Sequence, residues 1–125
     1  MLIERKNYPG LPQPVGPYVH AVKYGGLLFL SGITAFGTPG IGQGIAGQAE
    51  AIFSQIAAIA AQEGSSLQNL LKVTIFIREA DDLEGLRQVL DSVYGAAKPA
   101  SSLVVVKSLF APEIDVEVEA TLAVG

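Results

Sequence analysis

The sequence predicts a single α+β domain with both helices on one face of a mixed sheet and the element order β-β-β-α-β-α-β-β. First, 125 residues, of which half are apolar, suffice for one modest core and not for two. Second, apolar residues recur at helical spacing in two segments, one from residue 45 and one from residue 83. Third, short runs rich in β-branched residues surround these segments, and no repeat or linker divides residues 1–125.

The first half of the chain predicts a hairpin between irregular segments. Residues 2–6 favour a short strand, and the four prolines of YPGLPQPVGP at 8–17 predict an irregular connection. Residues 18–23 and 27–31 are expected to pair around a turn at Gly25-Gly26. The glycine-rich residues 33–44 then predict a loop.

The second half predicts two helices and three strands. A helix ends before Gly64 and has a buried stripe of Ile45, Ala49, Ile52, Phe53, Ile56, Ile59 and Ala60. Residues 70–78 alternate and favour a strand. Asp81 and Glu84 resemble the cap of a second helix, which ends at Gly95 and has the stripe Leu83, Leu86, Leu90 and Val93. Two strands near 102–107 and 114–124 complete the chain.

The last predicted strand has one apolar and one acidic face. Ile114, Val116, Val118, Ala120 and Leu122 alternate with Asp115, Glu117, Glu119 and Thr121. The second set either faces solvent or is partly buried by another subunit, in which case a carboxylate lies in a cleft. The apolar half of the composition and the mean hydropathy of +0.42 favour the second interpretation, and with it an oligomer.

Charge and composition exclude several classes of function. The net charge is −4 and the eight Lys and Arg are scattered, which argues against nucleic-acid and anionic-membrane partners. The chain has no cysteine and one histidine, so we expect no disulfide, no thiol chemistry and no metal site. No apolar run reaches the length of a membrane span, and the N-terminus lacks a signal-peptide core; we therefore expect a cytosolic protein.

Four local features are candidates for chemistry, each with a plainer alternative. The stretch GQGIAG at 42–47 fits a dinucleotide-binding pattern, but no acidic residue follows at the required place and no parallel βαβ pattern is expected around it. His20 and Ser31 are expected to be structural groups, because neither has an identifiable catalytic partner. Glu119 is a candidate general base if an interface buries it, and otherwise a surface carboxylate.

Several short motifs, taken in order, resemble the RidA (YjgF) family. They are GPY at 16–18, LLFLSG at 27–32, GSSLQNLLKVTIFI at 64–77, PAS at 99–101 and DVEVEATL at 115–122. The resemblance implies a chorismate-mutase-like fold assembled as a homotrimer, with a small-molecule site in each intersubunit cleft. It also implies hydrolysis of reactive enamines and imines, such as 2-aminoacrylate and 2-iminopropanoate, to a 2-keto acid and ammonia. No metal or organic cofactor takes part in that reaction.

The resemblance assigns functional residues position by position. Tyr18 matches a tyrosine that lines the cleft, Ser31 and Gly32 match a Ser-Gly pair at a strand end, and Glu119 matches the glutamate that holds the attacking water. Ser101, however, stands where the family has the arginine that grips the substrate carboxylate.

Three further positions depart from the family pattern. Ile33 replaces a glutamine, Arg87 an asparagine and Leu90 a tyrosine. Arg87 either brings a substitute guanidinium to the cleft or is a solvated surface residue. Two functions follow: an imine or enamine deaminase with altered or weakened substrate range, or a trimer that binds a small metabolite without efficient hydrolysis. An endoribonuclease is disfavoured because the chain is acidic.

Overall fold

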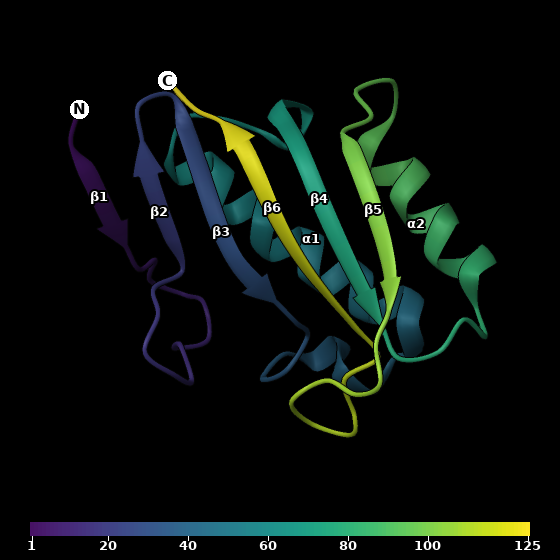
Figure 1. Ribbon diagram of the computed structural model, residues 1–125. Coiled ribbons are helices and arrows are strands. Elements are labelled where there is room, and N and C mark those ends of the chain that lie inside the picture. The colour runs from purple at the N-terminus through teal and green to yellow at the C-terminus, as the bar shows by residue number, and fades with distance from the viewer.

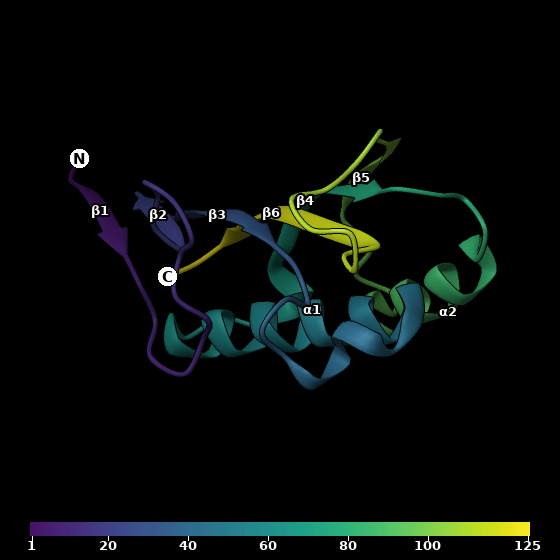
Figure 2. The same ribbon diagram turned by 90° about the horizontal axis from the view of Figure 1, so that it is seen from below.

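The protein has two layers, a six-stranded sheet and a pair of helices on one of its faces (Figures 1 and 2). The structure, a computed structural model, describes all residues 1–125. The strands are β1 (Ile3–Lys6), β2 (Ala21–Tyr24), β3 (Leu27–Ile33), β4 (Leu70–Ile77), β5 (Ala100–Val105) and β6 (Val116–Ala123). The α-helices are α1 (Gly44–Gln62) and α2 (Leu83–Tyr94), and short 3₁₀ helices span Pro39–Gly42 and Leu67–Asn69. The predicted fold class and element order are confirmed.

The last strand enters the middle of the sheet. The spatial order is β1-β2-β3-β6-β4-β5, with β4 and β5 parallel and every other neighbouring pair antiparallel. Since β3 and β4 both run antiparallel to β6, they are parallel to each other and α1 connects them. The expectation that no parallel unit surrounds residues 42–47 is therefore wrong. The sequence pattern missed this unit because β6, far away in the chain, separates its two strands.

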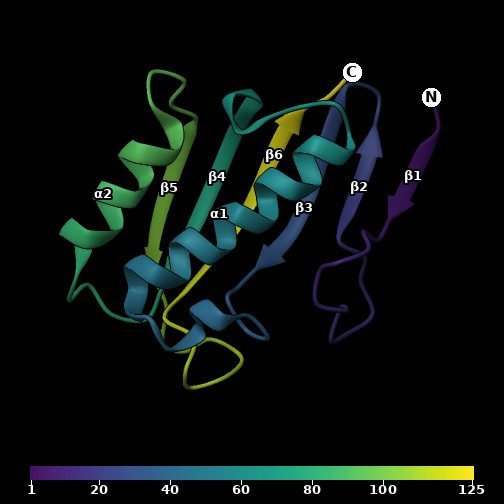
Figure 3. The same cartoon turned by 180° about the vertical axis from the view of Figure 1, so that it is seen from behind.

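The core lies between the sheet and α1, which crosses the sheet diagonally (Figure 3). The predicted stripe of α1 is buried from Ala49 to Ala60, and the Phe53 ring packs edge-to-face on Tyr94 of α2 with centroids 5.8 Å apart. Gly64 and Gly95 follow the two helices with φ of +69° and +56°. Both values lie in the left-handed region that favours glycine, as expected for residues that end a helix.

Several predicted boundaries shift. β2 begins at Ala21, so Tyr18 lies in the preceding segment, and β3 continues to Ile33. The cap of α2 is Asp82 and not Asp81, because the Asp82 side chain accepts a hydrogen bond from the Gly85 amide at 3.0 Å. The cap thus lies one residue later than predicted, while the apolar stripe that predicts the helix is the same.

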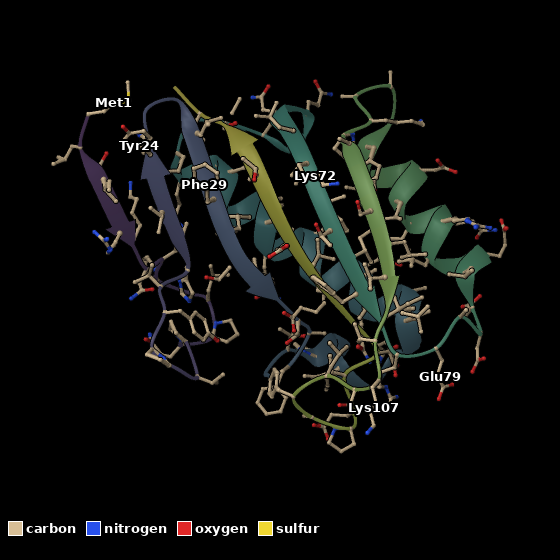
Figure 4. The ribbon with its side chains drawn as sticks, in the orientation of Figure 1. Met1, Tyr24, Phe29, Lys72, Glu79 and Lys107 are labelled. Atoms are coloured by element: carbon tan, nitrogen blue, oxygen red, sulfur yellow. The ribbon has the colours of Figure 1, made fainter.

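The face of the sheet opposite the helices carries mixed polar and apolar side chains, and we call it the open face. Figure 4 shows Tyr24, Phe29 and Lys72 on this face, which is turned toward the viewer. The predicted alternation of β6 is confirmed, since its even-numbered residues are buried and Glu119 on the other side is exposed. Neither helix is long and apolar enough to cross a membrane.

A buried glutamine joins the start of α1 to the start of β6. Gln48 is 1% exposed, and its Nε2 donates to the carbonyls of Ile41 and Glu113 and to the Asp115 carboxylate at 2.9–3.0 Å. Its Oε1 accepts from the Asp115 amide at 2.8 Å. These bonds satisfy a polar side chain in the core and fix the strand that carries the acidic residues.

Candidate functional site

A cavity of about 530 Å³ lies beside the C-terminal end of β3. Residues 7–20, which connect β1 to β2 and which we call the N-terminal segment, form another part of its wall. Most of its wall is apolar. The lining consists of residues 11–15, Tyr18, His20, residues 31–34, Phe36, Gln55, Ile59, Phe110 and Glu117. Its volume falls in the range of roughly 300–1,000 Å³ that is typical of small-molecule sites.

The histidine ring holds the N-terminal segment in place. His20 Nδ1 accepts from the Tyr8 amide at 2.9 Å, and Nε2 lies 2.9 Å from the Pro12 carbonyl oxygen. A carbonyl only accepts, so the hydrogen must lie on Nε2 and the neutral ring satisfies both bonds. Both ring nitrogens are thus occupied, which supports the structural interpretation of His20.

The Ser31 hydroxyl is also committed to the backbone. It donates to the Val19 carbonyl at 2.6 Å, while the Ser31 amide donates to the His20 carbonyl at 3.0 Å. These bonds attach the N-terminal segment to β3 and so bring Tyr18 to the same cavity as Gly32. The Tyr18 hydroxyl accepts from the Val15 amide at 3.2 Å, and the side chain is 45% exposed. Tyr18 therefore shares one wall with the adjacent pair Ser31 and Gly32, although Ser31 follows it by 13 residues in the sequence.

A half-buried carboxyl, Glu117, closes the cavity on the side of β6. Burial is the larger cause that raises the pKa of Glu117, and the nearby Glu119 charge raises it further. No hydrogen bond or ion pair opposes this shift. Gly32 explains how the carboxyl fits, because a methyl group on residue 32 would overlap the Glu117 carboxylate. The pairing of β3 with β6 is irregular between Leu30 and Ile33, the place where Gly32 lies.

Glu119 lies outside this cavity, in a second hollow on the open face. Its neighbours there are Phe29, Leu30, Lys72, Thr74, Ala120 and Thr121, around a volume of about 260 Å³. Glu119 is the strand partner of Thr74, and the Lys72 ammonium donates to the Ser102 hydroxyl at 2.8 Å. Since Glu117 and Glu119 are two residues apart on one strand face, their Cα atoms are roughly 7 Å apart. The two hollows are therefore neighbours.

Ser101 belongs to β5 and Arg87 to α2. These two elements lie at the opposite end of the sheet from β1 and β2 (Figures 1 and 3). Ser101 is the strand partner of Val73, which is buried beneath the helices, so its side chain is on the helix side of the sheet. Three strand spacings, roughly 14 Å, separate β5 from β3. Arg87 is exposed. One chain alone therefore does not bring these two residues to Tyr18 and Gly32.

Known proteins resemble this chain over most of its length. The family described as Endoribonuclease L-PSP matches residues 10–124. A RutC family protein of Pyrococcus abyssi is 31% identical over 113 residues, 87% of each chain. A 2-iminobutanoate/2-iminopropanoate deaminase of Dermatophagoides farinae is 33% identical over 104 residues, 81% of each chain. The crystal structure of RidA from Psychrobacter matches with a TM-score of 0.81 at 30% identity and covers 90% of this chain and 93% of that one.

This chain belongs to the RidA (YjgF) family. The resemblance drawn from the short motifs is thus confirmed as family membership, and the two-layer fold agrees with the solved RidA structure. The roles assigned to Tyr18, Ser31, Gly32, Glu119, Arg87 and Ser101 stay predictions. The structure adds that the first three share a cavity, while the last two lie on another side of the chain.

Two glycines of GQGIAG have a structural explanation. A side chain at Gly47 would overlap that of Gln43, and Gly44, the first residue of α1, has a φ of +73°, a value that favours glycine. These two glycines of the RidA-family chain therefore need no nucleotide to account for them.

One cavity residue, Glu117, was not singled out from the sequence. The alternation of β6 placed Glu117 and Glu119 on one face without distinguishing them, and the family motif drew attention to Glu119 alone. The Gly32 opposite Glu117 could have signalled it, because a glycine at the end of a strand often marks a close approach of another group.

Proposed function

We propose that this RidA-family chain hydrolyses reactive imines or enamines to a keto compound and ammonia without a cofactor, with an altered or weakened substrate range caused by Ser101. The observation that carries the proposal is the shared cavity wall of Tyr18, Ser31 and Gly32, with Glu119 in the adjacent hollow. The deaminase activity in the name of the D. farinae relative supports the same chemistry.

The reaction needs a positioned water and a route for protons. Water oxygen bonds to the carbon of C=N, the π electron pair moves to nitrogen, and nitrogen takes a proton, which gives a carbinolamine. The amino nitrogen of the carbinolamine then takes a second proton, the C–N bond breaks and ammonia leaves, and the hydroxyl loses its proton as C=O forms. A carboxylate such as Glu119 can orient the water and accept its proton, a contribution typically of about 10²–10⁴ in rate.

We further propose that the working site forms between subunits of a homotrimer. The separation of the two sets of residues supports this, because Ser101 and Arg87 can approach Tyr18 and Gly32 only from another copy. The edge strand β5 supports it too: all six of its residues are exposed, including Leu103, Val104 and Val105. An uncovered apolar edge strand is a ready site for another chain.

The missing arginine weakens the case for imino acids as substrates. A guanidinium forms two charge-assisted bonds to a carboxylate, and a single bond to a charged group contributes about 1.5–3 kcal/mol net. A serine hydroxyl supplies no charge, so we expect binding of an imino acid to be weaker by about 10- to 100-fold or more. Arg87 is a candidate substitute, and its truncation should then weaken carboxylate ligands.

A non-catalytic metabolite-binding trimer is the alternative, and Ser101 is the observation that favours it. Endoribonuclease activity, the description of the matching family, gains no support from a net charge of −4, because RNA binding needs clustered positive charge.

Hydrolysis of 2-iminopropanoate tests the proposal. The imine is generated in situ from alanine by an amino-acid oxidase in the presence of a trapping amine, and the rate of imine loss is measured. We expect slow acceleration by the unmodified chain and a clear increase for Ser101→Arg, because that variant restores the carboxylate anchor. Glu119→Gln in the Ser101→Arg background should remove the increase.

Absence of acceleration with and without Ser101→Arg would refute hydrolysis of such imines and favour the binding protein. The assembly is tested separately by sedimentation equilibrium, where a mass of one chain at micromolar concentration would contradict the trimer.

A further inference from the structure

The cavity beside β3 has an unusual balance of charge. Its wall includes the carboxyl of Glu117 and contains no lysine or arginine. The remaining polar groups are neutral side chains or are committed to the backbone, as His20 and Ser31 are. Within one chain, any ionic group of a ligand in this cavity therefore meets negative charge.

Glu117 lacks a partner within the chain. The residues of its neighbouring strands that lie beside it are Phe76, its partner on β4, and Gly32 on β3. The other titratable groups near it are Glu119 on its own strand and Tyr18 and His20 across the cavity. Burial and Glu119 both raise its pKa. A carboxylate in this position is stabilised by a cation, and the chain does not supply one.

We propose that this cavity binds a protonated primary amine, or the corresponding iminium ion, that has an apolar body and no carboxylate, with Glu117 accepting hydrogen bonds from its nitrogen. For the iminium ion, the proposal rests on the proposed function and names its substrate class. For the amine, it stands on the cavity alone.

The aromatic wall fits the apolar body of such a ligand. Phe36 and Phe110 meet edge-to-face with centroids 5.1 Å apart, although they are 74 residues apart in sequence, and both remain 40% or more exposed. Together with Ile33 they give an apolar surface that a small imino acid would not fill. A six-membered ring would cover this surface and could place an amino group at Glu117.

The same arrangement disfavours a carboxylate ligand. A carboxylate in the cavity would lie near Glu117 and Glu119 without a cation from the lining residues. Like charges in a partly dry site repel each other, and desolvation of the anion adds to the cost. Ser101 has the same consequence, since it removes the cation that the family would supply from elsewhere.

Three ligands that share a phenyl ring and differ in the charge of their polar group test the inference: benzylamine, benzoate and benzyl alcohol. Their binding to the full chain is measured by titration calorimetry at pH 7.5. We expect benzylamine to bind at least about 10-fold more tightly than benzoate. Glu117→Gln should weaken benzylamine by about 10-fold or more and leave benzyl alcohol unchanged, which also shows that the cavity of the variant is intact. Glu113→Gln, which removes one exposed charge, is the matched control and should change neither.

Equal or tighter binding of benzoate would overturn the inference, as would benzylamine affinity that is the same with and without the Glu117 carboxyl. Its failure is distinguishable from failure of the proposed function, because ligand binding involves no turnover. Hydrolysis of 2-iminopropanoate without Glu117-dependent amine binding would refute only this inference, and the reverse result would refute only the hydrolysis of imino acids.

Discussion

Replacing Glu63 by glutamine should destabilise the protein more than any other change of a single charge on α1. Glu63 caps the C-terminus of α1, and its side chain is 4% exposed. The carboxylate contacts Lys6 Nζ at 2.6 Å and Lys23 Nζ at 3.4 Å, and accepts from the Tyr8 hydroxyl at 2.9 Å. It thereby joins β1, β2 and the start of the N-terminal segment to the helix.

The structure gives the size of the effect. Loss of one partner of a fully buried ion pair costs about 3–5 kcal/mol, but the two lysines are 31% and 27% exposed, so solvent screens part of the loss. Glutamine also keeps an acceptor for the Tyr8 hydroxyl. We therefore expect Glu63→Gln to lower the free energy of unfolding by about 2 kcal/mol, against less than about 0.5 kcal/mol for the exposed control Glu50→Gln.

The pH dependence separates this cause from a packing effect. Burial alone raises the pKa of Glu63, but hydrogen bonds from Lys6 and Tyr8 outweigh it, and the pKa lies below its usual value of 4.5. A lowered pKa in the folded state contributes stability above the usual pKa, and this contribution is lost as the pH falls through the folded value. The difference between the unmodified chain and Glu63→Gln should be complete at pH 7 and shrink below about pH 4.5.

The assay is urea unfolding followed by circular dichroism, at one fixed protein concentration because assembly would change apparent stability. A difference at pH 7 no larger than that of Glu50→Gln would refute the reasoning. A difference that persists unchanged in acid would refute the electrostatic cause and leave packing as its origin.

Two further predictions concern single positions. Gly32→Ala should reduce benzylamine binding about 10-fold in calorimetry while changing the free energy of unfolding by less than about 1 kcal/mol, because its methyl displaces the flexible end of Glu117; unaltered binding would contradict the close contact. Asp82→Ala should cost about 1 kcal/mol in urea unfolding through loss of the bond to the Gly85 amide, whereas Asp81→Ala should cost less. A larger loss for Asp81→Ala would restore the cap expected from the sequence.

The elements of the fold were predictable because each has a local signal. The helical stripe of α1, the alternation of β6 and the glycines after both helices depend on neighbouring residues only. The order of the strands was not predictable in this way. No local pattern states that β6 inserts between β3 and β4, since that choice depends on which faces pack together after the chain has collapsed.

The candidate site was predictable only in part for the same reason. Tyr18, Ser31 and Gly32 follow from short family motifs, and the structure brings them to one cavity. Glu117 acquires its distinct environment from the irregular pairing of β3 with β6 and from Gly32 across the strand. A strand pattern records which face a residue occupies, but not the depth of the hollow beneath it.

Ser101, where the resemblance to the family implies an arginine, and Glu117 together bear on which ligand charge the proposed site would favour. With a guanidinium present, a carboxylate on the ligand would pair with it. The acids would then be free to orient the water and to exchange protons with the ligand nitrogen. With Ser101 in place of the guanidinium, Glu117 has no lysine or arginine in the lining of its cavity, and a positive charge on the ligand itself would compensate for this. Glu119, in contrast, shares its hollow with Lys72. The iminium form of an imine carries such a positive charge next to the carbon that water attacks. A RidA-type reaction on carboxylate-free imines thus needs no replacement for the arginine, whereas the same reaction on imino acids does.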